Sequence, residues 1–277
     1  MKTVAIVGAG ETAAQVARAL AALDVAGEIR LIDAATNVAL GKALDIQQTG
    51  PIDGFDTRVR GAADVSAAAG AAVVVVADRH GGGQPSTDEA IDLVRRIAAA
   101  APRAPVVFAS PDDRALLEAC ARELRIPASR LVGSAPEALA SGARALLALA
   151  AAASPLDTWL SIHGLPEAWV FAWSEATVAG RPVSAVLPPH EVGMAEQRIR
   201  ASWPPGPYAL GSAAARVTAA MLTRSRRRFT AFALLDGEWR HRAAAASVVL
   251  GPEGIAAREE PVLSARERVQ LATALSG

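Results

Sequence analysis

The stretch Thr3–Leu20, TVAIVGAGETAAQVARAL, decides the fold of this chain. Its apolar, β-prone start leads directly into the glycine turn Gly8-Ala9-Gly10 and then into an alanine-rich helical pattern. We expect Gly8 to permit a tight turn and Gly10 to let backbone N–H groups approach a pyrophosphate. The small Ala13 lets the helix pack closely against its strand. A strand, a glycine turn and a helix in this order predict a dinucleotide-binding unit.

A carboxylate at the expected distance supports this interpretation. A second β-prone run, Ile29–Ile32, ends at Asp33, which follows Ala13 by 33 − 13 = 20 residues. An acid about 20 residues on accepts hydrogen bonds from the ribose hydroxyls and repels a 2′-phosphate. The pattern therefore favours NAD over NADP as the cofactor. The alternative is an ordinary βαβ unit with a tight first turn.

Composition narrows the class of protein. The 277 residues carry 28 Lys and Arg against 28 Asp and Glu, so the net charge does not indicate nucleic acid or an anionic membrane as a partner. The single cysteine, Cys120, lies in a helical pattern that favours a small buried hydrophobe over a nucleophile. No pair of His, Asp or Glu residues has the spacing of metal ligands on a recognisable element, so we predict no metal site. The early strand leaves no room for a signal peptide, and we expect a soluble, cytoplasmic protein.

Strand and helix patterns alternate through the first half of the chain. The run Ala71–Ala77 and the segment Pro105–Ala109 are typical of strands that are covered on both faces. Between them, the glycine-rich segment Asp78–Ser86 predicts a mobile loop, and Thr87 is expected to cap the next helix. A further short strand ends at Gly133. This alternation predicts an α/β fold, with a doubly wound parallel sheet of the Rossmann type in residues 1–133.

The pattern changes after Gly133 and predicts an α+β domain over residues 134–277. Asp236-Gly237 is expected to form a hairpin turn between two antiparallel strands, and Ser264 with Glu267 forms a capping-box pattern for a last helix. The other expected elements are helices over Pro136–Ala152, Glu191–Ser202 and Tyr208–Arg224, and strands over Trp159–Ile162, Trp169–Trp173, Val183–Val186, Phe229–Leu235 and Ala246–Leu250.

Taken in order, these segments resemble the lactate/malate dehydrogenase family across nearly the whole chain. His163-Gly164, followed by Val170, Trp173-Ser174 and Thr177–Pro182 (TVAGRP), is similar to the signature around the family's catalytic histidine. Supporting matches are Gly41–Asp45 (GKALD), Gly142–Arg144 (GAR), Leu250–Gly254 (LGPEG) and Pro261–Ser264 (PVLS).

The resemblance implies hydride transfer between the nicotinamide of NAD and a 2-hydroxy/2-oxo acid. His163 is then the residue that exchanges a proton with the substrate oxygen, and Arg144 is the residue that binds the substrate carboxylate. The cofactor-binding residues are Gly8, Gly10, Ala13, Asp33 and Ser110. The resemblance also implies a homo-oligomer, with a subunit contact through the helix that contains Leu44-Asp45-Ile46.

Several positions differ from the family pattern. Gly81 or Gly82 stands in place of the arginine that polarises the substrate carbonyl, and Ser141 in place of the aspartate that orients the histidine. Ser110-Pro111 replaces Asn-Pro, and Leu165 replaces the acid after His-Gly. Two hypotheses follow. The protein is an NAD-dependent 2-hydroxyacid dehydrogenase with an altered substrate, larger or less polar; or it is a dinucleotide-binding relative that has lost catalysis and acts by binding.

Overall fold

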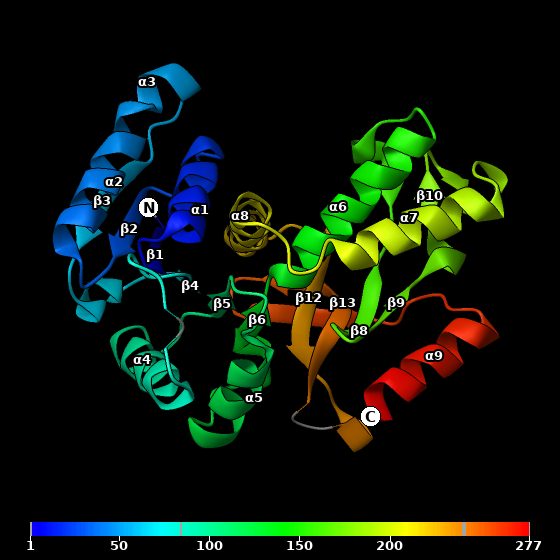
Figure 1. Cartoon of the computed structure of the whole chain (residues 1–277). Helices are drawn as coiled ribbons and strands as arrows, with labels where there is room; N and C mark the ends of the chain where they lie inside the picture. The colour runs from blue at the N-terminus through cyan, green and yellow to red at the C-terminus, as the bar shows by residue number, and fades with distance from the viewer. Residues whose placement is uncertain (1, 84, 240–241, 277) are drawn as a thin grey trace.

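The computed structural model describes residues 2–83, 85–239 and 242–276, and its elements are labelled in Figure 1. Its helices are α1 (Glu11–Ala22), α2 (Thr36–Gln48), α3 (Gly50–Asp53), α4 (Thr87–Ala100), α5 (Arg114–Glu123), α6 (Ala135–Ala150), α7 (Pro189–Ala201), α8 (Pro207–Thr223) and α9 (Ala265–Ser276). Its strands are β1 (Thr3–Val7), β2 (Glu28–Ile32), β3 (Arg58–Ala62), β4 (Val73–Val76), β5 (Val106–Phe108), β6 (Leu131–Gly133), β7 (Thr158–Trp159), β8 (Ile162–Leu165), β9 (Ala168–Phe171), β10 (Thr177–Val178), β11 (Arg181–Pro182), β12 (Arg228–Leu234), β13 (Ala243–Gly251) and β14 (Gly254–Glu259).

The strands of the first half form a parallel sheet in the order β3-β2-β1-β4-β5-β6. Val7 pairs with Ile32 on one side and with Val76 on the other, so the carboxyl ends of these strands lie at the same edge. The chain order reverses beside β1, where β2 and β4 lie on opposite sides. Ligands of such sheets bind at the carboxyl ends of the strands beside this reversal. The predicted α/β fold is confirmed.

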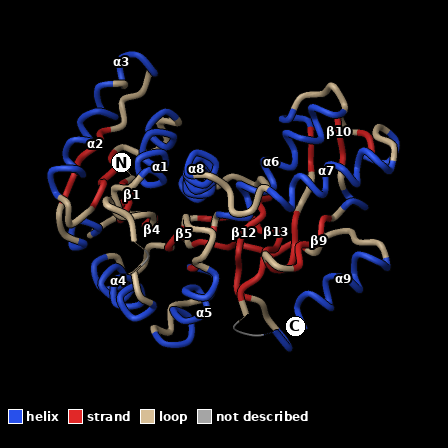
Figure 2. Tube along the Cα trace, viewed as in Figure 1, coloured by secondary structure: helices blue, strands red, loops and turns tan. Residues whose placement is uncertain are grey.

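The sheet continues into the second half of the chain through antiparallel strands. Phe232 of β12 pairs with Gly133 of β6, and the order continues β12-β13-β8-β9, with β14 paired to β13. Figure 2 shows the strands as one band between helices. The separate sheet β11-β10-β7 lies beside α6 and α7 (Figure 1).

Helices cover both faces of the parallel strands, as the runs of β-branched residues predicted. Val16 of α1, Ala43 of α2 and Val217 of α8 belong to the apolar core on one face. Leu93 of α4 and Leu117 of α5 belong to the core on the other face. Both faces of the strands are therefore removed from water by small aliphatic side chains.

Several expected boundaries were wrong, each for a local reason. The strand expected at Trp159–Ile162 divides at Leu160-Ser161 between β7 and β8, because the two ends join different sheets. Val183–Val186 is not a strand: after Pro182 the chain turns into a 3₁₀ helix over Val183–Ala185, in which the Val183 carbonyl accepts the Val186 amide. The capping residue of α4 is Ser86 rather than Thr87, and it forms a full capping box with Glu89.

The link between β12 and β13 is longer than the predicted two-residue hairpin at Asp236-Gly237. The strand β13 already begins at Ala243, and a 3₁₀ helix over Gly237–Trp239 occupies part of the link, in which Arg240 and His241 lie outside the described residues. The strand β14 was not predicted, because its alternation of apolar and polar residues is weak. The capping box of α9 is confirmed: the Glu267 amide donates to Ser264 Oγ, and the Ser264 amide donates to Glu267 Oε2.

Candidate functional site

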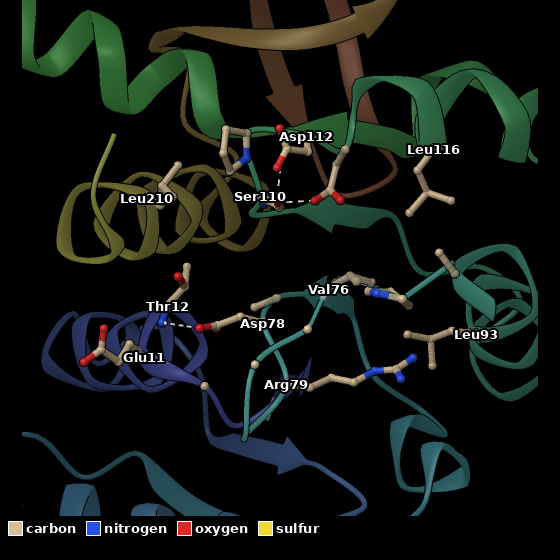
Figure 3. Close-up of a pocket in the computed structure, with 18 of the residues that line it drawn as sticks. Glu11, Thr12, Val76, Asp78, Arg79, Leu93, Ser110, Asp112, Leu116 and Leu210 are labelled. Atoms are coloured by element: carbon tan, nitrogen blue, oxygen red, sulfur yellow. Dashed lines mark hydrogen bonds between the residues drawn. The ribbon is translucent and has the colours of Figure 1, made fainter. Parts of the chain in front are cut away.

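A cavity of about 730 Å³ lies at the carboxyl ends of β4 and β5, beside the start of α1. The residues around it come from the glycine turn, the loop after β4, the segment after β5 and the first turn of α8, as Figure 3 shows. Gly10 and Ser110, two of the predicted cofactor-binding residues, line this cavity. Its position is the one expected for a dinucleotide in a sheet of this order.

The amino-terminal amides of α1 already have an acidic partner. Asp78, the second residue after β4, accepts hydrogen bonds from the Thr12 amide at 3.2 Å and from the Ala13 amide at 2.8 Å (Figure 3). These are the helix N–H groups that a phosphate would use. The Asp78 carboxylate thus caps α1 in place of a side chain from the turn, since Gly10 has none.

The two glycines of the turn are needed where Asp78 approaches. Gly8 has φ +122°, and a methyl group there would overlap the Asp78 carbonyl oxygen. The Gly10 amide donates to that same carbonyl oxygen at 2.9 Å. A methyl group on Gly10 would overlap the Asp78 carboxylate itself. The space that Gly10 leaves, which the sequence assigned to a pyrophosphate, therefore holds the side chain of Asp78.

Asp33 lies at the end of β2, as predicted, and is buried. Its Oδ2 accepts the Ala9 amide at 2.8 Å and the His80 amide at 3.0 Å, while Oδ1 accepts the Ala35 amide at 2.8 Å. A carboxylate has about four lone-pair positions, so Asp33 can still accept from ribose hydroxyls. The hydrogen bond to His80 ties the loop after β4 to the place where the ribose was expected.

The loop after β4 runs through Gly81, Gly82 and Gly83, which have φ values of +86°, +74° and +87°. The Arg79 side chain points away from α1 toward α4 (Figure 3) and lines a smaller hollow with acidic residues of that helix, among them Asp92. Arg79 also lines the cavity beside α1, but its guanidinium is turned toward α4 (Figure 3). Lys42 of α2 also reaches the glycine turn, where its Nζ donates to the carbonyls of Ala9 and Gly10 at 2.7 and 2.9 Å.

On the opposite wall, Ser110 opens the segment that follows β5. The Ser110 amide donates to Asp113 Oδ2 at 2.9 Å, and its hydroxyl accepts the Asp112 amide at 3.3 Å. Burial raises the pKa of Asp113 to about 7, and the neighbouring charge of Asp112 adds to the shift. This wall therefore holds an acid that titrates near neutral pH.

His163 is placed on β8 and is 3% exposed. Its Nε2 lies 2.8 Å from Ser161 Oγ, and Ser161 donates to Glu175 Oε1 at 2.6 Å. Because the serine proton is used toward Glu175, the serine oxygen accepts from Nε2–H, which leaves Nδ1 as the unprotonated nitrogen. Burial lowers the pKa of His163 to about 4, while the charge of Glu175 opposes this shift.

Arg144 of α6 is also buried, with 5% exposure. Its Nη1 donates to Glu137 Oε1 at 2.7 Å, and Glu137 Oε2 accepts the Thr230 amide at 2.8 Å. The guanidinium lies 4.9 Å from the centre of the Trp159 ring. Its Nε and Nη2 atoms are buried and have no hydrogen-bonding partner among the described residues.

Trp159 connects the two predicted catalytic residues. Its Nε1 donates to Glu175 Oε1 at 3.4 Å, the same oxygen that accepts from Ser161. We call the set His163, Ser161, Glu175, Trp159, Arg144 and Glu137 the polar network. The structure thus brings His163 and Arg144 into one network, but neither is among the described residues that line the cavity beside α1.

Ala13 is fully buried beside β1, which agrees with the packing role expected of it. Cys120 is buried, as the predicted small hydrophobe would be, and burial raises the pKa of its thiol to about 12. Within the described part of the chain, no group of three or more His, Cys, Asp or Glu side chains could hold a metal ion. The helices described for this chain include none that is both long and apolar enough to span a membrane.

Sequence reasoning missed Asp78, Ser161 and Glu175. For Asp78 a signal was available: it follows β4, and the carboxyl ends of adjacent parallel strands meet at one edge, so an acid there faces the glycine turn. For Ser161 the signal was its spacing of two from His163, which puts both side chains on one face of an extended segment. Glu175 is distant in sequence from the helix where the orienting acid was sought, and local spacing could not identify it.

Comparison with known proteins gives consistent results. Residues 2–103 match the family model described as lactate/malate dehydrogenase, NAD binding domain. A malate dehydrogenase of Thioalkalivibrio sulfidiphilus is 31% identical over 301 aligned positions, which cover all of this chain and 97% of that protein. A malate dehydrogenase of Thermomicrobium roseum is 30% identical over 72% of this chain and 67% of its own length.

Solved structures share the whole fold. The malate dehydrogenase of Salinibacter ruber superposes with a TM-score of 0.91 at 25% identity, covering 99% of this chain and 94% of that one. The lactate dehydrogenase of Cryptosporidium parvum, solved with lactic acid and nicotinamide adenine dinucleotide, also gives a TM-score of 0.91, at 18% identity over 99% and 95% of the two chains. At that identity the second likeness concerns the fold alone.

Proposed function

This chain belongs to the lactate/malate dehydrogenase family, and on that basis we propose that it interconverts a 2-hydroxy acid and the matching 2-oxo acid. The prediction of NAD as cofactor is confirmed by the match of residues 2–103 to the family's NAD binding domain. The glycine turn and the buried Asp33 fit a dinucleotide. The amides of α1 can bind a diphosphate only after the Asp78 carboxylate has moved away from them. When bound, NAD supplies the hydride acceptor of the reaction.

One observation carries the assignment of an acid substrate. The Nε and Nη2 atoms of Arg144 lie on the same edge of the guanidinium, and both are buried without a partner among the described residues. This edge can make two parallel hydrogen bonds to a carboxylate. A buried, unpaired donor is costly, so an edge left unpaired in this way favours a ligand with two acceptor oxygens. Glu137 holds the opposite side of the guanidinium and so fixes its orientation.

In the proposed reaction His163 moves the proton. Its pKa near 4 keeps the imidazole neutral at neutral pH, which is the form that accepts the hydroxyl proton of a 2-hydroxy acid. Glu175, acting through Ser161, holds the proton on Nε2 and leaves Nδ1 to accept. We assign to this pair the positioning role of the aspartate that the sequence lacks at Ser141.

The cavity walls support a substrate that is larger or less polar than pyruvate or oxaloacetate. Gly81 and Gly82 offer no cation, and Arg79 is directed toward α4. Leu93, Leu116 and Leu210 line the cavity from three different helices (Figure 3). Such walls favour apolar parts of a ligand, and the glycines of the loop offer no partner for a second carboxylate on the 2-oxo acid.

The test is NADH oxidation with pyruvate, oxaloacetate and 2-oxo acids with branched or aromatic side chains. We expect turnover with a bulky 2-oxo acid, and a loss of roughly 10²-fold or more in His163→Asn with NADH binding unchanged. His190→Asn is the matched control, because His190 is exposed at the start of α7. NADH binding without turnover of any 2-oxo acid contradicts the proposal and returns the protein to the class of dinucleotide binders without catalysis.

Three further expectations remain proposals. The exposed Leu40 and Leu44 of α2 support a homo-oligomer that uses the predicted contact segment, since large apolar side chains there would be covered by a second copy. A cytoplasmic location and a domain boundary near Gly133 also remain predictions.

A further inference from the structure

Asp78 lies where the charge of a dinucleotide would have to lie. Its two carboxylate oxygens accept from the Thr12 and Ala13 amides, and its side chain fills the space that Gly10 leaves open. A diphosphate binds such a helix start through the same N–H groups. Two anions cannot occupy these amides together, because both the donors and the space are shared. The carboxylate and the diphosphate therefore exclude one another.

The surroundings show how Asp78 is held and how it can leave. Asp78 is exposed, so its displacement uncovers little apolar surface. The loop that follows it is tied back by the His80 amide to Asp33 and then passes through three glycines with positive φ. Lys42 keeps a positive charge at the glycine turn whether or not the carboxylate is present.

We propose that Asp78 sets the cofactor affinity of this protein, by acting as a built-in competitor that a dinucleotide must displace from the start of α1. The inference depends on the NAD binding domain and not on the proposed substrate chemistry. It is therefore tested by binding, without a 2-oxo acid, and its failure is separate from a failure of the dehydrogenase assignment.

The first experiment is titration with NADH, followed by its fluorescence, of the wild-type chain and of Asp78→Asn and Asp78→Ala. We expect both variants to bind NADH roughly tenfold tighter or more, because charge-assisted hydrogen bonds to the amides become available to the diphosphate. Asp88→Asn is the matched control. It removes the same charge from the first turn of a neighbouring helix, α4, where Asp88 is exposed and is not among the described residues that line the cavity. Its affinity should stay within about threefold of wild type.

The second experiment separates the diphosphate from the rest of the ligand. Calorimetric affinities for adenosine and ADP are compared in the wild type and in Asp78→Asn, which keeps an oxygen that can cap the helix. We expect the ratio of the two affinities to be close to one in the wild type and to rise roughly tenfold in the variant. Wild-type protein that binds ADP at least about tenfold tighter than adenosine overturns the proposal. So do folded Asp78 variants whose affinity for NADH is unchanged or weaker.

Discussion

The hydroxyl of Ser161 lies 2.8 Å from Nε2 of His163 and fixes which of the two ring nitrogens carries the proton. The serine can do so because its own proton is directed to Glu175 at 2.6 Å. Ser161, two positions before the strand residue His163, thus places the Glu175 carboxylate in indirect control of the histidine. The arrangement leads to two predictions about proton transfer.

The first concerns the pH dependence of the two directions of the reaction. Burial lowers the pKa of His163 to about 4, Glu175 opposes that shift, and Arg228 lies 3.5 Å from Glu175 on its other side. Reduction of a 2-oxo acid needs the protonated imidazole, so kcat/KM for reduction should fall about tenfold per pH unit above pH 5. Oxidation needs the neutral form and should be level from pH 5 to 7. Steady-state rates from pH 5 to 8 decide this, and a reduction rate that stays level up to pH 7 contradicts it.

The second concerns Glu175→Gln. Loss of its charge removes the interaction that raises the pKa of His163, so the pH profile for reduction should move to lower pH and kcat should fall roughly 10²-fold with little change in KM. Ser161→Ala should have a similar effect, and the double variant should be no worse than either single one. Glu196→Gln, which removes a carboxylate that accepts from Trp173 and Arg200, is the control and should leave the profile in place. If the losses of the two single variants add up in the double variant, Glu175 does not act on His163 through Ser161.

The third prediction concerns the unpaired edge of the Arg144 guanidinium. Arg144→Lys keeps the positive charge beside Glu137 but cannot offer two parallel donors to a carboxylate. We expect kcat/KM for the 2-oxo acid to fall roughly 10²-fold while NADH affinity is unchanged. Arg200→Lys serves as the control, because that arginine pairs with Glu196 on α7 and is outside the polar network. If both variants keep full activity, Arg144 does not hold the substrate.

The fourth prediction concerns stability without nucleotide. Asp78→Ala leaves the Thr12 and Ala13 amides without their acceptor, and the free energy of unfolding should fall by about 1 kcal/mol. Asp78→Asn should lose less, because an amide oxygen still accepts. Urea denaturation followed by circular dichroism measures both. Saturating NADH should restore more stability to Asp78→Ala than to the wild type, and an equal gain in both would be the contrary result.

The fifth prediction concerns assembly. Leu44 is 60% exposed on α2, and Leu44→Glu would place a charge in the proposed contact between copies. Sedimentation velocity should then show a smaller species than the wild type. Leu149→Glu, on α6 and 77% exposed, is the control and should sediment like the wild type. A wild-type chain that sediments as a monomer would end this proposal.

Most of the fold could be predicted because its strongest signals are local. The valine run that became β4 and the glycine turn before α1 are determined by a few adjacent residues. The errors lie where the pairing of strands, and not the local sequence, determines the structure. Leu160 and Ser161 have the pattern of the middle of a strand, but the residues on either side of them pair in different sheets. The same holds for Val183, whose β-branched side chain favours a strand although the backbone there turns.

The candidate site was predictable only in part, because its contacts join distant segments. The spacing of Asp33 from the glycine turn placed it correctly at the end of β2. The position of Asp78 after β4 indicated that an acid faces the glycine turn, although not that it reaches the α1 amides across 65 positions, and no local pattern indicated that Glu175 meets Ser161. The shared carboxyl edge of β1 and β4 made the first contact possible, and the two-sheet arrangement around Trp159 made the second.

The carboxylate at the start of α1 turns nucleotide binding into an exchange of one anion for another. The Thr12 and Ala13 amides are already paired with a carboxylate of the chain itself, so a diphosphate meets donors that are occupied. When a diphosphate replaces Asp78, the electrostatic gain is largely cancelled by the interaction that is given up. Discrimination among nucleotides is then left to their uncharged parts, the sugar and the rings, which meet Asp33 and the apolar walls.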